Sequence, residues 1–228
     1  IELQNNEDYL GLALQKMTNA LKRNKTDLAI EKLKLEEQDW IKGHQADLLA
    51  SLQGLKTLPK LAEIVVNNLV PLLDAHLGLF YMKEESNESK KKKGVCYSLL
   101  SSYAYKKRKD ISNTFALGEG LVGQSALEKK TILLTEAPKH YIEINSGSGK
   151  GAPRNIIVVP VVFEGETIAA IEIASAGKIT EKHQTLLDVF STNIGVIINN
   201  IISQQRTKSL LEKSEEMREE LQPKQEEL

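Results

Sequence analysis

Two adjacent apolar runs constrain the fold of this chain most strongly. Residues 156–163 and 167–175 consist largely of Ile, Val and Ala, and Glu164-Gly165 stands between them. Runs of this length around a two-residue turn are typical of a β-hairpin. Because both faces of each run are apolar, the sequence predicts two central strands in a sheet that is covered on both sides.

The residues on either side of this hairpin alternate between strand and helix patterns, which predicts a compact α+β (α/β) domain. A Gly- and Ser-rich stretch before the hairpin is expected to be a long loop, and such loops are more often functional than filler. The predicted segments are a helix at 58–74, strands at 77–83, 95–105 and 112–117, a short helix at 121–128, a strand at 131–135 and the loop at 138–154.

A long helical pattern without Pro precedes this domain, between Glu7 and about Leu55. Its apolar residues keep a spacing of three, four or seven, which is the pattern of a coiled-coil seam. Asn24 falls on the seam, where a polar residue fixes the register at some cost in stability. The expected seam consists of Leu10, Leu14, Met17, Leu21, Asn24 and Leu28.

A second helical pattern runs from Thr180 towards the end of the chain. Its first part would pack on the sheet or on the same helix of a second copy, and the sequence leaves both alternatives open. Its last part steps by alternating four and three residues, as a coiled coil does. Exposed seams of this length predict a parallel homodimer. The expected seam residues here are Phe190, Ile194, Ile197, Ile201, Leu210, Met217 and Leu221.

Composition limits the function classes. The formal net charge is −1, which gives no overall attraction to nucleic acid. Two basic runs, 90–93 and 106–109, lie at opposite ends of one predicted strand, so we interpret them as solvated hairpin tips and expect no nucleic-acid partner. No run approaches the roughly 18 apolar residues of a membrane span. Cys96 is the only cysteine, which excludes an intramolecular disulfide.

Catalytic and metal-binding motifs are incomplete. Residues 123–127 begin like a nucleophile elbow but lack its closing Gly. Residues 146–151 are similar to a phosphate loop, yet the first Gly of that motif and the Ser or Thr after its Lys are missing. None of the four His residues has a metal-ligand spacing beside a Cys or a carboxylate pair. We therefore predict no enzyme activity, metal or cofactor within these residues.

Three segments in order resemble a GAF domain, a small sensory α/β module. They are the turn Leu117-Gly118-Glu119-Gly120-Leu121-Val122-Gly123-Gln124, the strand at 131–135 and the hairpin at 155–174. The resemblance covers roughly residues 58–202 and implies a GAF-like central antiparallel sheet with flanking helices, extended by long N- and C-terminal coiled-coil helices. A single cysteine departs from the methionine sulfoxide reductase branch of the family, whose chemistry needs several.

The flanking helices carry two further resemblances. Asn6-Glu7-Asp8-Tyr9-Leu10-Gly11-Leu12-Ala13 is similar to the second helix of a HAMP domain, the relay beneath bacterial transmembrane receptors, although a generic coiled-coil helix is an alternative. Residues 210–228 resemble the signalling helix that links GAF domains to output domains in hybrid sensor histidine kinases. The implied division is a partial HAMP-like helix at 1–25, a connecting coiled-coil helix at 26–57, a GAF domain at 58–202 and a signalling helix at 203–228.

The GAF resemblance also implies a ligand site between the sheet and the loop that crosses it. Glu172 would supply polarity below the ligand, because it is expected to share a face with Ile168, Ala170 and Ala174, where an unpaired carboxylate is costly. The hairpin register places it opposite Ile157 or Val158. For Tyr141 and His140 a purely structural role is an equal alternative. The implied wall residues are Phe80, Cys96, Val122 and Leu134, and the implied lid residues are His140, Tyr141, Ser146 and Arg154.

Two hypotheses follow from these resemblances. The first is a non-catalytic, dimeric module of a two-component sensor histidine kinase, in the cytoplasmic portion of a membrane-anchored receptor, that relays conformational change from HAMP-like helices to the kinase. The second is a sensor that binds a nucleotide or another small metabolite through Arg154 and the Gly-Ser loop, with a different output such as a nucleotide cyclase or phosphatase. An open or filled cavity below residues 138–154 would distinguish them.

Overall fold

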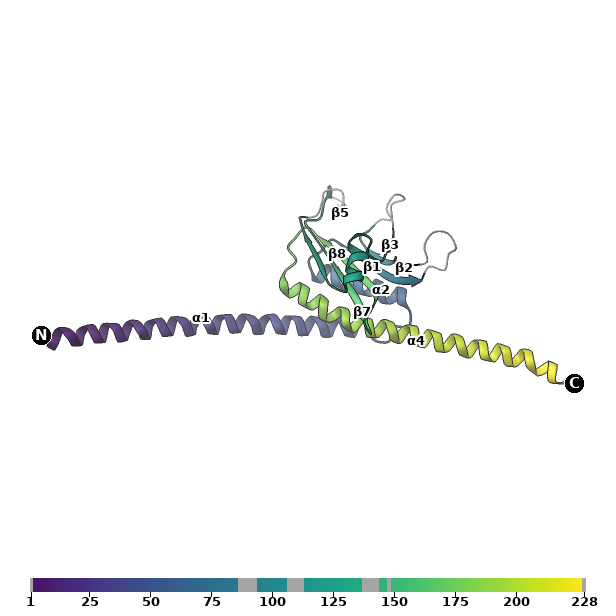
Figure 1. Cartoon of the computed structure of the whole chain (residues 1–228), viewed down its shortest axis with the longest axis horizontal. Coiled ribbons are helices and arrows are strands. Elements are labelled where there is room, and N and C mark those ends of the chain that lie inside the picture. The colour runs from purple at the N-terminus through teal and green to yellow at the C-terminus, as the bar shows by residue number, and fades with distance from the viewer. Residues whose placement is uncertain (1, 86–93, 106–112, 137–143, 147–148, 227–228) are drawn as a thin grey trace. The chain divides into compact units, whose positions relative to one another are not determined.

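The structure is a computed structural model that describes residues 2–85, 94–105, 113–136, 144–146 and 149–226. It contains two compact units, residues 1–44 and 45–228. The first unit consists of most of helix α1 (Glu2–Ser51), drawn in purple in Figure 1. Every side chain of this helix from Tyr9 to Asp39 is exposed, so its expected seam is free of contacts within the chain.

The second unit is built around a six-stranded antiparallel sheet with the order β3-β2-β1-β8-β7-β4 (Figure 1). The predicted hairpin supplies the adjacent strands β8 and β7, and β8 is flanked on both sides. The strands are β1 (Leu77–Glu85), β2 (Val95–Tyr103), β3 (Thr114–Ala116), β4 (Ile132–Thr135), β7 (Asn155–Phe163) and β8 (Glu166–Ser175).

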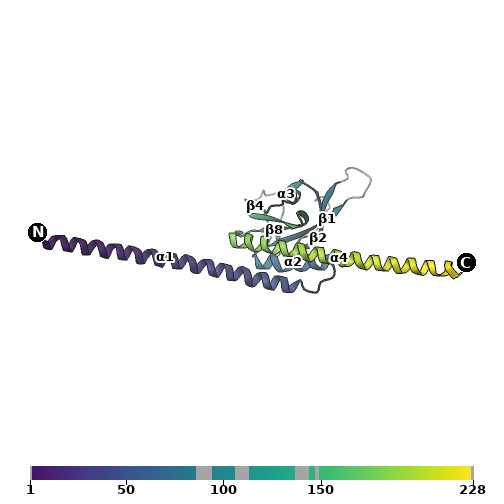
Figure 2. The same cartoon turned by 60° about the horizontal axis from the view of Figure 1, so that its bottom comes forward.

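Helices cover both faces of this sheet. Helix α2 (Leu58–Leu72) packs on β1 and β2, and the first part of α4 (Glu181–Glu226) packs on β7. The short helix α3 (Gly120–Glu128) lies on the opposite face, against β7 and β8 (Figure 2). The predicted fold class, an α+β domain with a central antiparallel sheet and flanking helices, is therefore confirmed.

The hairpin turn sets the pairing of β7 and β8 next to it. Glu164 and Gly165 have φ angles of 49° and 79°, which are the two positive values of a type I′ turn. The register shifts by one residue between Val161 and Val162, and beyond this irregularity Val158 pairs with Glu172, one of the two predicted partners. Pro160 has no N–H to donate and lies beyond the last residue of β7 that pairs with β4, as expected for Pro at a free edge.

The α2 and α4 face is filled by apolar side chains. Six residues of α2 are buried, and Gly78 of β1 lets this helix approach, since a side chain there would meet Val70 at 2.5 Å. Gly195 of α4 similarly lies against the carbonyl of Val162. The buried residues of α4 are Leu186, Leu187, Phe190, Ser191, Ile194, Gly195, Ile198 and Ile201.

This packing corrects the expected seam of the C-terminal helix. Phe190, Ile194 and Ile201 are buried within their own chain, and Ile197 is half-buried, so these four do not form a free dimer surface. The sequence left both alternatives open, and packing on the sheet is the one observed. The exposed apolar residues of α4 instead include Val189, Val196, Leu210 and Met217, which are separated by multiples of seven. The side chain of Leu221 lies outside the described residues.

Some predicted boundaries also change. The predicted strand at 95–105 ends at Tyr103 because Ala104 turns the chain with a φ of 54°. Part of the predicted loop at 138–154 forms a separate two-stranded sheet from β5 (Ile144–Ser146) and β6 (Gly149–Gly151). Its sequence is rich in Gly and Ser, which are not strand formers, so composition alone predicts a loop there.

One described helix is long and apolar enough to cross a membrane by length and composition, the part of α4 at residues 181–218. Core helices of folded domains pass the same test. The buried side chains of this segment pack on the sheet, which accounts for its apolar character.

Candidate functional site

The most unusual group in the described structure is the side chain of Glu172, in the middle of β8. Its neighbours across the sheet are Leu79 of β1 and Val158 of β7, and Ala170 and Ala174 flank it along its own strand. These four apolar residues belong to one buried cluster on the α3 face, so Glu172 points into that cluster. Only 2% of its surface is exposed.

One of the two carboxyl oxygens of Glu172 has a partner. The hydroxyl of Tyr81 donates to Oε2 over 3.1 Å, whereas the buried Oε1 has no hydrogen bond to any described residue. Burial raises the pKa of Glu172 to about 7, and the Tyr81 bond opposes this rise. A carboxyl group in this position leaves a hydrogen-bonding site open whether or not it is protonated.

Two further polar contacts lie at this cluster, and the second of them holds α3. The hydroxyl of Tyr97 donates to the carbonyl of Thr167 over 2.9 Å, and Thr167 donates to the carbonyl of Ala126 in α3 over 2.8 Å. Burial raises the pKa of Tyr97 to about 12, with a contribution from Glu166. Tyr97 is therefore a neutral donor at physiological pH, and it fixes β2 against β8.

The glycine turn before α3 sets the position of that helix. Gly118 and Gly120 have φ angles of 83° and 61°, in the left-handed region that favours glycine. A side chain at Gly123 would lie 2.1 Å from the carbonyl oxygen of Ala116. The Glu119 carboxylate accepts a bond of 2.8 Å from the N–H of Ala116, which closes the turn.

The rim of the cluster is only half-buried. Tyr81 meets Phe115 edge to face, with ring centroids 5.5 Å apart. Large apolar groups that keep part of their surface exposed, at the edge of a cluster with a buried carboxyl group, differ from an ordinary sealed core. The rim residues that pack against the cluster are Val95, Leu99, Tyr105, Phe115, Leu121 and Leu134.

The structure brings only some of the predicted site residues together. Val122 and Leu134 belong to the cluster or its rim, on the same face as Glu172. Phe80 lies on the other face of β1, the face of Gly78 that is turned towards α2. Tyr97 belongs to the cluster, so its neighbour Cys96 lies on the opposite face of β2. Neither Phe80 nor Cys96 therefore lies beside Val122. The Cys96 thiol is half-buried, 3.5 Å from the carbonyl oxygen of Glu84. Of the four expected wall residues, two therefore lie on the face of Glu172.

The predicted lid residues are less well placed. The side chain of Arg154 is exposed, and its backbone N–H donates to the carbonyl of Ser175 over 2.9 Å. Ser146 pairs with Gly149 through the backbone, and its side chain lies outside the described part. His140 and Tyr141 also lie outside the described residues. Arg154 and Glu172 are therefore not partners in the described structure.

Two site residues escaped prediction, Tyr81 and Tyr97. The alternation Leu77, Leu79, Tyr81 along β1 was the available signal, since it places Tyr81 on the face of Glu172. The pairing of β1 with β2 shifts by one residue between Phe80 and Tyr81. The spacing of residues in the sequence does not reveal such a shift.

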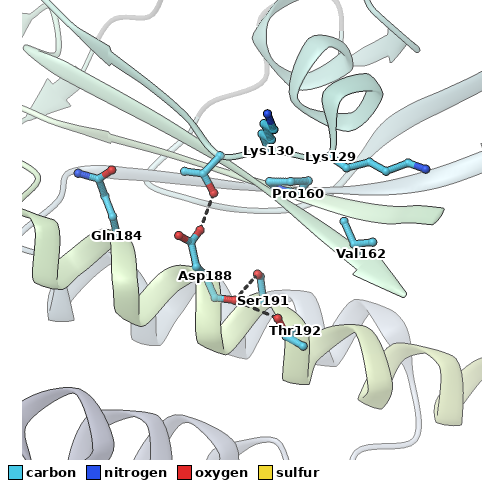
Figure 3. Close-up of a pocket in the computed structure, with 9 residues that line it drawn as sticks. Lys129, Lys130, Pro160, Val162, Gln184, Asp188, Ser191 and Thr192 are labelled. Carbon is cyan, nitrogen blue, oxygen red and sulfur yellow. Dashed lines mark hydrogen bonds between the residues drawn. The ribbon is translucent and has the colours of Figure 1, made fainter. Parts of the chain in front are cut away.

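A hollow of about 600 Å³ opens at the sheet edge beside β4, between the loop after α3 and helix α4 (Figure 3). The Thr131 hydroxyl donates to the Asp188 carboxylate across it. None of its lining residues belongs to the Glu172 cluster. They are Lys129, Lys130, Thr131, Pro160, Val162, Gln184, Asp188, Ser191 and Thr192. Within the described part of the chain, no group of three or more His, Cys, Asp or Glu residues is placed to hold a metal ion.

Comparison with protein families gives a match to the GAF domain model over residues 56–199. Comparison with curated proteins gave no match. The matched segment spans α2, the central sheet and the first part of α4.

Solved structures share the fold at low sequence identity. The GAF domain of a phosphoenolpyruvate-protein phosphotransferase from Coxiella burnetii has a TM-score of 0.58 at 15% identity, covering 73% of this chain and 96% of that one. The corresponding Acinetobacter domain has a TM-score of 0.56 at 16% identity, covering 71% and 93%. A free methionine-R-sulfoxide reductase from Neisseria meningitidis, solved with its substrate, has a TM-score of 0.58 at 13% identity, covering 72% and 91%.

Proposed function

Because the chain belongs to the GAF domain family, we propose that it is a non-catalytic, signal-transmitting module of a two-component sensor histidine kinase, placed between HAMP-like input helices and a kinase output. The observation that carries this proposal is the continuity of α4. The helix begins in the buried layer under the sheet and continues unbroken to Glu226, a length of about 70 Å at 1.5 Å per residue. Any change in the sheet is thereby coupled to a rigid exposed rod.

The exposed part of α4 supports a dimeric relay. All described side chains from Ile202 to Arg218 are exposed, including Leu210 and Met217. Val189 and Val196 continue the same seven-residue stripe back over the domain, on a side of the helix that leaves Phe190 buried. A seven-residue apolar stripe is the pattern of a coiled coil, and a second copy of this chain is the proposed partner.

Helix α1 supplies the proposed input side. Its exposed seam contains Leu14, Leu21 and Leu28 at intervals of seven, with Asn24 as the polar position. In this proposal the HAMP-like segment at 1–25 and the connecting helix at 26–57 pass a change in helix packing to the domain. The receptor would be membrane-anchored with this module on the cytoplasmic side, and the relay would work by shifting two packing states.

A cysteine scan tests the α4 seam. In a Cys96→Ala background, single cysteines from residue 206 to residue 214 are oxidised, and covalent dimers are quantified. We expect cross-linking to peak at Leu210→Cys and to be at least tenfold slower at Lys208→Cys, which lies off the stripe. A flat profile, or a monomer in sedimentation equilibrium at tens of micromolar, would refute the dimeric relay.

A second experiment tests transmission. Asn24→Leu replaces the polar seam residue and should favour one packing register of α1. If the module relays signals, the cross-linking rate at Leu210→Cys changes severalfold in this variant. Lys25→Leu, which adds the same side chain off the seam, is the control. Identical rates in all three proteins would contradict the relay while leaving dimerisation intact.

One observation favours a second candidate function, a small-molecule sensor. Glu172 keeps an unpartnered oxygen under a half-buried apolar rim on the α3 face. A ligand there would bias the relay only if it bound the two packing states with different affinity. Both candidate functions use the same fold, and they differ in whether a small molecule binds on the α3 face.

A further inference from the structure

We infer that Glu172 is the anchoring point of a binding site for a small apolar molecule that carries an N–H donor, such as an aryl-alkyl ammonium ion. This inference rests on the second candidate function above, a sensor site on the α3 face. The inferred ligand differs in charge from the one expected from Arg154, because an arginine would bind an anion.

The hydrogen-bond geometry at Glu172 defines the missing group. Oε2 already accepts a bond from Tyr81, whereas Oε1 is buried and accepts none from any described residue. A carboxylate oxygen is an acceptor, so its complement is a donor. An ammonium or other N–H group donates to it in a charge-assisted bond, which is about twice as strong as a neutral one.

The charges around Glu172 disfavour an anion. Burial and the Tyr81 bond are the two influences on its pKa, and no Lys or Arg contributes. Arg154, the cation that the sequence suggested, is exposed. A phosphate or carboxylate placed beside Glu172 would therefore face a second negative group in a desolvated site, which is costly.

The surroundings of Glu172 define the rest of the molecule. Ala170 and Ala174, which flank it along β8, are small apolar residues of the same buried cluster. Phe115, Leu121 and Leu134 on the rim keep part of their apolar surface exposed. An apolar body on the ligand would cover that surface, because burying apolar area is favourable.

The test uses the 228-residue chain and three probes of one shape, benzylamine, benzyl alcohol and benzoate, with affinities from calorimetry and NMR titration. We expect benzylamine to bind at least tenfold more tightly than benzoate, with benzyl alcohol between them. Glu172→Gln should weaken benzylamine binding at least tenfold and leave benzyl alcohol within threefold. Glu164→Gln, an exposed carboxylate on the same hairpin, is the matched control and should change nothing.

A pH series sharpens the test. Benzylamine stays protonated between pH 5 and pH 8, so its affinity should fall by up to about tenfold per pH unit below pH 7 as Glu172 gains a proton. The same series in Glu172→Gln should be flat. Near-ultraviolet circular dichroism of each variant establishes that it is folded.

The outcomes separate this inference from the proposals on which it rests. Equal or tighter binding of benzoate, or unchanged benzylamine affinity in Glu172→Gln, would refute the N–H donor class while leaving a sensor site. Absence of binding by all three probes at millimolar concentration would refute the inference, while a sensor site for a ligand of another class would remain. The cross-linking scan of α4 needs no ligand, so it decides the mechanical relay independently.

Discussion

The two faces of the central sheet are built from alternate residues of the same strands, yet they differ in kind. On the α2 and α4 face, long helices cover the sheet, and apolar residues such as Leu69 and Phe190 are fully buried. On the α3 face a nine-residue helix covers β7 and β8, the rim residues are half-buried, and Glu172 places a carboxyl group at the centre.

The two faces therefore contribute differently to the stability of the domain and to its capacity for binding. Completely buried apolar area supplies most of the stabilising free energy of a domain. A buried, half-satisfied carboxyl group lowers stability, since it loses hydration without full replacement. The α2 and α4 face therefore stabilises a sheet on which the α3 face can carry a destabilising group that is suited to recognition.

The largest expected effect compares one aromatic residue from each face. Phe190→Ala removes a side chain that is 1% exposed, and it should lower the free energy of unfolding by about 4 kcal/mol. Phe115→Ala on the open rim should cost less than half as much, because its ring already contacts solvent. Urea unfolding of both variants measures the two values, and equal costs would remove the distinction between the faces.

The next effect concerns Glu172 and pH. The folded-state pKa of about 7 exceeds the ordinary value of 4.5, so the folded protein binds the proton more tightly than the unfolded chain. The stability contributed by this protonation is complete below pH 4.5 and is lost as the pH rises through 7.

Relative to Glu172→Gln, which does not titrate, the parent should lose about 3 kcal/mol of stability between pH 4 and pH 8. Urea unfolding of both proteins at several pH values measures the difference, in which all other titrations cancel. Glu164→Gln should follow the parent. A constant difference between parent and Glu172→Gln would show that Glu172 is not desolvated.

A smaller effect tests how β2 is held against β8 on the α3 face. Tyr97→Phe removes the hydroxyl that bonds to the carbonyl of Thr167, and the loss should be about 1 kcal/mol. Tyr103→Phe on the same strand, for which no hydroxyl bond is seen in the described structure, is the control and should cost less. Thermal unfolding resolves this difference, and similar losses would mean that the Tyr97 bond contributes little.

The smallest effect concerns the edge where the two faces meet. Thr131→Val removes the hydroxyl that joins the loop after α3 to Asp188 of α4, near the hollow shown in Figure 3. Because this bond is exposed, its loss should cost about 0.5 kcal/mol or less. Hydrogen exchange at residues 185–192 should nevertheless increase in the variant, and unchanged exchange would show that the bond does not couple the loop to the helix.

Much of the fold was predictable because its elements obey local rules. The Glu164-Gly165 turn and the apolar runs around it predicted β7 and β8, with Ile157 or Val158 opposite Glu172, and the segment after the glycine turn predicted α3. These features depend on backbone conformation and alternation, which neighbouring residues determine.

The site was less predictable because it depends on long-range packing. Phe80 and Cys96 were expected beside Val122, but the face on which each strand residue lies depends on the register with distant strands, and β1 and β2 pair irregularly. The same limit applied to Phe190 and Ile194, whose spacing suits either a sheet-packed helix or a coiled coil. Glu172 was identified because it is the one charged residue in an otherwise apolar stretch of its strand, on the same face as Ala170 and Ala174.

The central claim is that the α3 face holds a desolvated carboxyl group with an open hydrogen-bonding site. It is tested most directly by following the side-chain carboxyl carbon of Glu172 by NMR from pH 4 to pH 9, with assignment from Glu172→Gln. The account predicts a single titration with a pKa of about 7. A pKa near 4.5 would show that Glu172 is solvated or fully paired, and it would contradict the account.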